Sequence, residues 1–398
     1  MVSVKGIITK NITLNKFKEL FLSDINSFRL VGGYIRDYFI GLESDDFDVA
    51  TIFNPEELRS FCNNNKIEFF DIGGIYGSIG VKIDDHVIEI TPTRLDIKSY
   101  GRHADIEYIA DWQEDSKRRD FTINAFYVDF DENLYDYHNG LSDLEATKIK
   151  FIGNSIDRIE EDYLRILRGY RFEAELPGFA LDQNDKKVLE NKVQKLTQLS
   201  SSRLKIELIK ILGTKQAVQY CKYFSDIGLW SVLGLQFDVT SILEQNWLKL
   251  QSRSAILLVT VLNIEDNFKN LQSILDLSNK ELAIIKVITK YLNIELSDQS
   301  LAMICYNYSK IRAQQLLSVF YLKNKISAKA YNDYNRFIDD LQILDFPISG
   351  NDLKALGISQ GLVIGRILEQ LKLIWFESKM MMDKDELIQH AKKISPKS

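Results

Sequence analysis

The periodicity of the sequence changes near Lys150, and this change limits the folds open to the chain. Before Lys150, helical patterns separate short β-rich runs, namely SFRLVGG, SIGVKI, HVIEITPT and FTINAFYVDF. After it, nearly every segment has the period of an amphipathic helix, as in SSRLKIELIKIL and GLVIGRILEQLKLIWFE. Only five prolines occur in the whole chain, which favours long uninterrupted helices. We therefore expect an α+β protein, in which an N-terminal domain with a mixed β-sheet precedes an all-helical remainder.

Length and composition exclude several classes of protein. The 398 residues suffice for two or more domains, and 45% hydrophobic with 27% charged residues is ordinary globular composition. No uninterrupted apolar run reaches 18 residues and no secretory signal is recognisable, so we expect no membrane association. Cys62, Cys221 and Cys305 lack the spacing of a metal site or a disulfide framework, which favours the cytoplasm. A net charge of −6 argues against a protein coated in nucleic acid but permits a local basic groove.

The stretch SDDFDVAT crowds three aspartates beside an apolar run. In a strand, residues two apart share a face, so Asp46 and Asp48 would project together while Phe47 and Val49 face the core. Glu89, between two isoleucines of HVIEITPT, is a third acidic candidate. Mg²⁺ prefers hard oxygen ligands, so we expect Asp46 and Asp48 to hold Mg²⁺ and Glu89 to complete the catalytic acids. For the acid pair by itself, a solvated turn remains the alternative.

Just upstream, an apolar strand runs into Gly32 and Gly33 and then into a helical pattern. Glycine lets backbone N–H groups approach an anion closely, and the N-terminus of a helix favours negative charge. A Gly-Gly pair alone is more often just a turn. Strand, Gly-Gly, helix and an acid pair on the next strand together suit a triphosphate bound beside its metal ions.

Five motifs stand in a characteristic order: LVGGYIRDYFIG with DDFDVAT, then RRDFTINAF, YDYHNGLSDLEATKIK, EEDYLRILRGYRF and SSRLKIELIKIL. They resemble the motifs of the class II nucleotidyltransferase family, the bacterial-type tRNA CCA-adding enzymes and their poly(A) polymerase relatives. The resemblance implies Mg²⁺ as cofactor, CTP and ATP as substrates and tRNA as partner; no protein partner is inferred. It also implies four parts: a polymerase β-like nucleotidyltransferase head at 1–149, a helical neck for nucleobase recognition at 150–212, an RNA-binding helical body at 213–300 and a tRNA-binding helical tail at 301–398.

The resemblance also implies nucleotide-binding roles for residues of these motifs. Arg119 and Asp120 would face the triphosphate and the sugar, and Asn124 a ribose hydroxyl. Arg168 would face ribose or phosphate. Without the resemblance, a surface charge cluster before a strand would be the better interpretation of KRRD. The complete nucleotide-binding set is Gly32, Gly33, Arg36, Arg119, Asp120, Asn124, Glu161, Asp162, Arg165 and Arg168.

The stretch EDYLRILRGYRF has helical periodicity, and on a helix Asp162 and Arg165 would be neighbours. Asp162 can accept from an exocyclic amine while Arg165 donates to the adjacent ring nitrogen. Cytosine and adenine present that order of groups, whereas uracil and guanine present the reverse. A mismatch leaves buried polar groups unpaired, at about 1–3 kcal/mol each. An ordinary helix salt bridge is the alternative; the resemblance favours a base-reading edge in which Glu161 orients Arg165.

The predicted activity is template-independent addition of CCA to the tRNA 3′ end, with release of pyrophosphate. Addition of CC alone or of A alone is one alternative. A poly(A) polymerase is another, although FFDIGGIYGSIGV lacks the basic pair usual in those enzymes. A non-catalytic RNA-binding protein is a third, yet none of the metal acids is lost. One departure from the family stands in the fifth motif, where Ser202 precedes Arg203 in place of the common glutamate.

Overall fold

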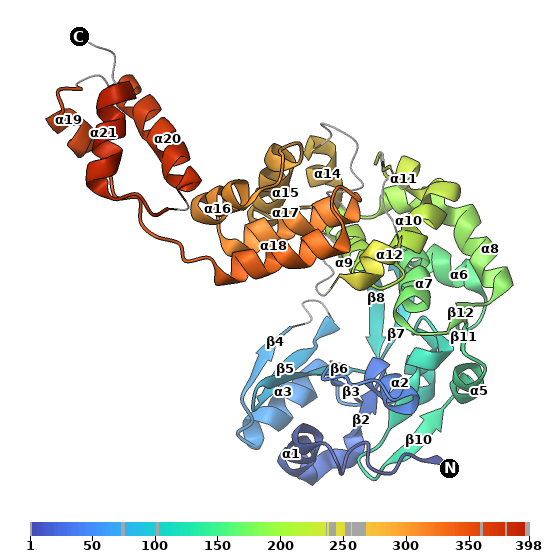
Figure 1. Ribbon diagram of the computed structural model, residues 1–398. Helices are drawn as coiled ribbons and strands as arrows, with labels where there is room; N and C mark the ends of the chain where they lie inside the picture. Colours follow the sequence, from blue (N-terminus) through green and yellow to red (C-terminus); the bar gives the residue numbers. More distant parts are fainter. Residues whose placement is uncertain are drawn as a thin grey trace. The chain divides into compact units, whose positions relative to one another are not determined.

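The polypeptide forms two compact units (Figure 1). The first comprises Met1–Thr214 with Tyr223–Gly234, and the second Lys215–Lys222 with Leu235–Ser398. The first unit thus contains the segments predicted as head and neck, while the four-part division itself stays a prediction. The computed structural model describes residues 2–72, 76–100, 103–235, 237–238, 244–250, 256, 268–358, 361–378 and 380–394.

A mixed eight-stranded sheet forms the N-terminal part of the first unit, as the sequence predicted. Neighbouring strands pair antiparallel except β3 and β6, which are parallel. In spatial order the strands are β1 (Val2–Ser3), β10 (Asn133–Asp136), β9 (Phe126–Val128), β2 (Phe28–Val31), β3 (Asp48–Thr51), β6 (His86–Pro92), β5 (Ile79–Ile83) and β4 (Phe69–Asp71).

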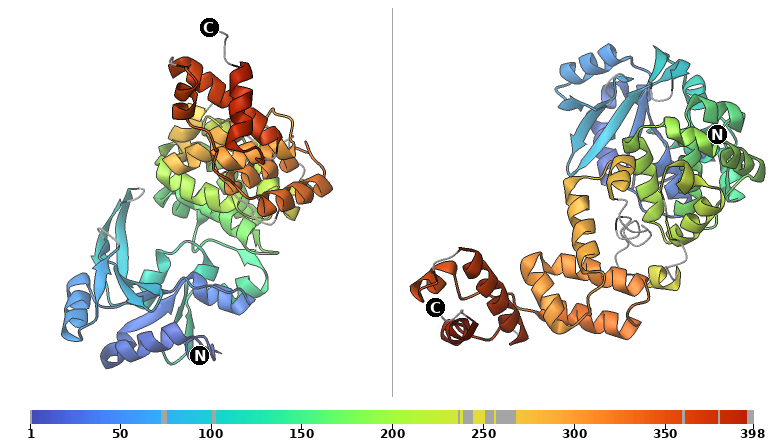
Figure 2. Two further views of the ribbon diagram at one scale, coloured as in Figure 1. Left: turned by 60° about the vertical axis from the view of Figure 1, so that its left-hand side comes forward. Right: turned by 90° about the horizontal axis from the view of Figure 1, so that it is seen from above.

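Helices build the rest of the first unit (Figures 1 and 2). They are α1 (Ile12–Leu20), α2 (Gly33–Ile40), α3 (Pro55–Asn64), α4 (Trp112–Lys117), α5 (Gly140–Glu145), α6 (Ser155–Glu161), α7 (Leu164–Glu175), α8 (Gln183–Lys192), α9 (Ser201–Leu212) and α11 (Leu229–Val232), with the 3₁₀ helices η1 (Leu22–Ser27), η3 (Thr122–Asn124) and η4 (Val193–Gln198). Two further strand pairs are the antiparallel hairpin of β7 (Arg94–Tyr100) and β8 (His103–Tyr108), and the parallel pair of β11 (Lys148–Ile149) and β12 (Ala180–Leu181).

The two faces of the large sheet differ in character, and this difference positions the candidate site. Val49 points into the main apolar core, which also contains residues of α1 and α3. Val31 and Ala50 belong to a smaller apolar cluster. Because side chains alternate along a strand, Asp48 shares the face of Ala50. The strand pairing places Asp48 beside Val31 of β2 on one side and beside Glu89 of β6 on the other.

The helix predicted over EDYLRILRGYRF is interrupted near its start. α6 ends at Glu161, Asp162 is extended (φ −153°, ψ 107°), and α7 begins at Leu164. The Asp162 carboxylate accepts the Leu164 N–H at 3.1 Å, a local hydrogen bond that competes with helix continuation. The prediction of one continuous helix is therefore wrong at this point. The expected contact between Glu161 and Arg165 is present, with 2.6 Å between Oε2 and Nη1.

The second unit is helical, as predicted. Every residue from Leu316 to Leu322 on α17 is buried, which fits a helix that is apolar on all sides and has α15, α16 and α18 packed around it. Among the described helices, none combines the length and the apolar character that crossing a bilayer requires. The helices are α12 (Glu244–Lys249), α14 (Phe268–Leu275), α15 (Asn279–Tyr291), α16 (Asp298–Asn307), α17 (Lys310–Leu322), α18 (Ala328–Asp340), α19 (Gly350–Ala355), α20 (Gly361–Glu377) and α21 (Lys384–Ile394); α10 (Ala217–Asp226) runs across the boundary between the units.

Candidate active site

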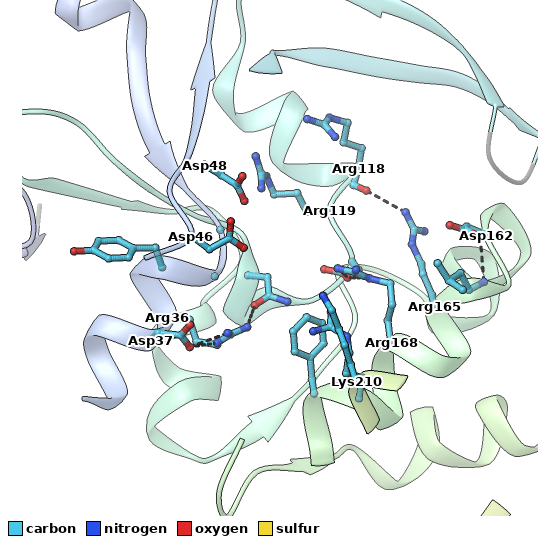
Figure 3. A pocket seen from close by; sticks show the side chains of 18 of the residues that line it. Arg36, Asp37, Asp46, Asp48, Arg118, Arg119, Asp162, Arg165, Arg168 and Lys210 are labelled. Carbon is cyan, nitrogen blue, oxygen red and sulfur yellow. Dashed lines mark hydrogen bonds and ion pairs between the residues drawn. The ribbon is translucent and has the colours of Figure 1, made fainter. Parts of the chain in front are cut away.

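A cleft of about 690 Å³ in the first unit contains every predicted site residue except Glu89 (Figure 3). Nine basic and seven acidic side chains line it, so this acidic chain has a locally basic cleft that suits a polyanion. The predicted residues that line it are Gly32, Gly33, Arg36, Asp46, Asp48, Arg119, Asp120, Asn124, Glu161, Asp162, Arg165 and Arg168.

Several lining residues were not selected from the sequence. Arg118 stands within KRRD and Arg171 within EDYLRILRGYRF, so both motifs contained a usable signal. Arg94 lies on β7 and Lys210 on α9, where no local pattern marks a cleft. Only tertiary contacts bring these two side chains to the same space as the motif residues.

Asp46 and Asp48 lie together at the sheet end of the cleft, and Figure 3 shows them directed toward the same space. The strand was predicted to include Asp46, but β3 begins at Asp48. Burial raises the pKa of Asp48 to about 6; the charges of Asp46 and Glu89 add to this effect and Arg119 opposes it. The negative charge of the pair is thus only partly compensated, by Arg119.

The donor set of this corner fits Mg²⁺, because the two acidic side chains supply carboxylate oxygens, the hard ligands that this ion prefers. Within the described residues, no three acidic, histidine or cysteine side chains converge to form a ready-made metal site. Glu89, expected as the third catalytic acid, neighbours Asp48 in the sheet; its carboxylate accepts from the Thr91 hydroxyl at 3.4 Å and does not line the cleft, and its catalytic role stays a prediction. Two protein carboxylates are a usual number for Mg²⁺ that also binds substrate phosphates.

Gly32 and Gly33 form the turn between β2 and α2. Gly32 has φ +83° and ψ −143°, a backbone conformation that side chains strongly disfavour. From this turn the first N–H groups of α2 have no helical partners and remain available to an anion. Later on the same helix, Arg36 donates to the side-chain oxygen Oδ1 of Asn124 at 2.6 Å and to the Asp37 carboxylate at 2.7 Å. Arg36 thereby orients the Asn124 amide.

The segment after α4 contributes Arg119 and Asp120. Arg119 donates through Nε to the Tyr127 hydroxyl at 2.9 Å. Asp120 is paired with Arg168 of α7, at 2.6 Å from Nε and 2.5 Å from Nη2. Burial alone would raise the pKa of Asp120, but Arg168 outweighs it and holds the pKa at about 2. Asp120 is therefore a permanent anion that fixes the Arg168 guanidinium at the cleft.

Asp162 and Arg165 lie at the far end of the cleft from the acid pair (Figure 3). Arg203 of α9 donates to both oxygens of Asp162, at 3.1 and 2.7 Å. Arg165 donates from Nη1 to Glu161 and to the Arg158 carbonyl, and from Nη2 to the Arg118 carbonyl. Hydrogen bonds to other protein groups thus fix the positions of both Asp162 and Arg165, the two members of the predicted base-reading edge.

The chain is similar to known nucleotidyltransferases. Residues 28–150 match the family model described as "Poly A polymerase head domain". Over 390 residues the chain is 30% identical to "CCA tRNA nucleotidyltransferase 1, mitochondrial" of Mus musculus, covering 96% of this chain and 90% of that protein. It is 30% identical over 327 residues to the "CCA-adding enzyme" of Staphylococcus epidermidis, covering 79% and 76%. The crystal structure of the Bacillus stearothermophilus CCA-adding enzyme in complex with CTP has the same fold, with a TM-score of 0.78 over 96% of this chain and 98% of that chain, at 20% identity.

Proposed function

Because this chain belongs to the family of CCA-adding tRNA nucleotidyltransferases, we propose that it adds CCA to the 3′ end of tRNA from CTP and ATP. The transfer is template-independent and releases pyrophosphate. One observation carries the proposal: a carboxylate pair suited to Mg²⁺ and a carboxylate–guanidinium edge suited to a nucleobase line the same basic cleft.

At the phosphate end, Asp46 and Asp48 would hold Mg²⁺, with Glu89 acting on the site through its charge. When bound, the ion would favour deprotonation of the tRNA 3′-hydroxyl and stabilise negative charge on the leaving pyrophosphate. The free N–H groups at Gly33 and the start of α2 would bind triphosphate oxygens. Arg119 would donate to the same phosphates, since its Nη1 lies 3.8 Å from the position a Cβ at Gly32 would take.

At the base end, the contacts within the protein leave Asp162 with one free acceptor position and Arg165 with free N–H donors. A carboxylate offers about four acceptor positions. On Asp162 the N–H groups of Leu164 and Arg203 occupy three, which leaves one on Oδ2. Of the five Arg165 N–H groups, three donate to protein oxygens, and Nε–H with one Nη2–H has no partner among the described residues. This supports binding of cytosine and adenine over uracil and guanine.

Between the two ends, Asn124 and Arg168 would bind the sugar. The Asn124 carbonyl oxygen is engaged by Arg36, so its NH₂ group, which has no hydrogen bond to any described residue, can donate to a ribose oxygen. Asp120 holds Arg168 so that the unused N–H groups of the guanidinium face ribose or phosphate. The charge of Asp120 thus acts on the nucleotide through Arg168.

The decisive assay incubates tRNA ending at its discriminator base with Mg²⁺ and labelled CTP or ATP, separately and together. We expect two additions from CTP alone and a third with ATP. Products that stop after CC, or additions of A restricted to tRNA ending in CC, would identify a partial enzyme. Long ATP-only tails on unstructured RNA would identify a poly(A) polymerase. Failure to incorporate CTP would overturn the proposal.

Asp46→Asn and Asp48→Asn test the metal site directly. Each should abolish incorporation while thermal unfolding and tRNA binding stay close to wild type. Asp45→Asn is the matched control, because Asp45 is an exposed neighbour that does not line this cleft, and it should remain active. Retained turnover in both Asp46→Asn and Asp48→Asn would show that the metal site lies elsewhere.

For the compartment we propose the cytoplasm, supported by three cysteines that are buried and far apart in the sequence, without the spacing of a disulfide framework. The name of the mouse relative contains the word mitochondrial. Cell fractionation followed by immunoblotting distinguishes the two locations.

A further inference from the structure

Asp115, on the short helix α4, is a completely buried carboxylate beneath the cleft. Its Oδ1 accepts from the Arg118 Nε at 2.7 Å and from the backbone N–H of Arg94 at 3.0 Å. Its Oδ2 accepts from the Tyr127 hydroxyl at 2.5 Å and lies 3.6 Å from Nη2 of Arg119. Asp115 itself does not line the cleft, whereas Arg94, Arg118 and Arg119 do.

Arg119 is held on two sides by this junction. The Tyr127 hydroxyl accepts from its Nε at 2.9 Å and donates to Asp115, so one tyrosine oxygen connects the guanidinium to the carboxylate. These contacts engage Nε and Nη2. They leave Nη1 near Gly32, at the glycine turn where the triphosphate is proposed to bind. The direction of the phosphate-facing N–H group is thus determined by Tyr127 and Asp115 together.

The same carboxylate also anchors the β7–β8 hairpin. The Arg94 N–H bound by Asp115 belongs to the first residue of β7, and the Arg94 and Asp96 side chains line the cleft. The Arg94 guanidinium lies over the Tyr76 ring, 4.1 Å from its centroid, and its Nε is 3.3 Å from Asp96. One buried anion therefore joins the start of the hairpin to both arginines that follow α4.

We propose that Asp115 is a positioning residue for nucleotide binding: it aims Arg119 at the phosphates, and it holds Arg118 and the start of the β7–β8 hairpin at the same cleft. This inference rests on the proposed function and assigns a role to a residue outside the cleft.

The chemistry of the junction explains why a carboxylate is needed. Burial would raise the pKa of Asp115, but Arg118, Arg119 and Tyr127 outweigh burial and hold the pKa below its usual range. A neutral side chain of the same shape could accept some of these hydrogen bonds but could not balance two arginines. The arginines would then turn toward other anions, such as Asp48, which lines the cleft and whose charge already acts on Arg119.

The test compares Asp115→Asn with Asp111→Asn, a matched control on the same helix. The Asp111 side chain caps α4 by accepting from the N–H groups of Gln113 and Glu114 and contacts neither arginine. We expect Asp115→Asn to lower kcat/KM for both CTP and ATP by about tenfold or more, chiefly through KM. Asp111→Asn should leave both kcat/KM and the thermal midpoint close to wild type, because asparagine keeps the accepting oxygen and caps a helix about as well as aspartate.

A double-mutant cycle separates positioning from general stability. If Asp115 acts through Arg119, Asp115→Asn should lower kcat/KM less than about threefold in an Arg119→Lys background. A purely structural role would give the same fold-loss in both backgrounds, and that result would overturn the inference. If Asp115→Asn does not fold, Tyr127→Phe replaces it, because it removes the hydroxyl that links Asp115 to Arg119 and keeps the carboxylate.

Two results have different meanings. Wild-type protein that fails to incorporate CTP refutes the proposed function. Active wild-type protein with an unchanged kcat/KM in folded Asp115→Asn refutes only the role of Asp115.

Discussion

Asp162→Asn tests whether the base is read by a hydrogen-bonding edge. The replacement keeps the shape of the side chain but exchanges one acceptor oxygen for an NH₂ donor. In the wild type, Arg203 donates to both oxygens and the Leu164 N–H donates to Oδ1, so the new NH₂ group opposes two donors at the Oδ1 position but only one at the Oδ2 position. The Oδ2 position is therefore favoured, and there the amide no longer accepts from the exocyclic amine of cytosine or adenine.

The magnitude follows from the hydrogen bond between the Asp162 carboxylate and the exocyclic amine, which the variant cannot make with its NH₂ group at the Oδ2 position. A hydrogen bond to a charged group contributes about 1.5–3 kcal/mol, which corresponds to roughly a 10- to 150-fold loss of kcat/KM for CTP and ATP. UTP should lose less, because its O4 accepts where the new NH₂ group donates. We therefore expect the CTP-to-UTP ratio of kcat/KM to fall by about tenfold.

The assay is steady-state incorporation of each nucleotide into tRNA that lacks its CCA end. Asp157→Asn is the control, because Asp157 is exposed on α6 and does not line the cleft. Thermal unfolding of each variant separates a folding defect from a change in recognition. A folded Asp162→Asn protein with an unchanged CTP-to-UTP ratio would refute the base-reading role of this carboxylate.

Three further predictions concern stability. The pKa of Asp48 is raised to about 6, so its ionised form destabilises the metal-free fold above that pH. Without metal at pH 8, Asp48→Asn should therefore have a thermal unfolding midpoint equal to or above that of the wild type. A clearly lower midpoint would contradict this. Glu132→Gln should cost about 1–3 kcal/mol in urea unfolding at pH 7, because Glu132 accepts from the N–H groups of Gly6, Ile8 and Thr9 and from the Thr9 hydroxyl. Burial opposes these hydrogen bonds, yet they hold the pKa of Glu132 below its usual value, so the wild-type advantage should exist at pH 7 and disappear as the pH falls through that lowered pKa; an advantage that persists in acid would refute this cause. Gly140→Ala should destabilise the first unit by about 1–3 kcal/mol in calorimetry, since the added Cβ would lie 2.5 Å from the Thr122 carbonyl oxygen, and an unchanged midpoint would show that the backbone relaxes freely.

Local patterns were sufficient for the sheet and for much of the cleft. The period of two around Asp48 placed Val49 in the core, and the pairing confirms that Asp48 and Glu89 are neighbours. The pattern could not show whether the Glu89 side chain lines the cleft, and in the structure it does not. It also could not show the break at Asp162, where one side-chain hydrogen bond prevails over helical periodicity.

The sequence by itself determined the α+β architecture, the acid pair, the glycine turn and the order of the motifs, because each depends on residues close together in the chain. Only the tertiary structure decided which partners hold the functional side chains. Arg203 supports Asp162 from 41 residues away, and Asp115 reaches back 21 residues to Arg94. The physical reason is that a buried charge must be balanced by whichever opposite charge the fold brings within hydrogen-bonding distance, and the spacing of residues in one chain does not specify that partner.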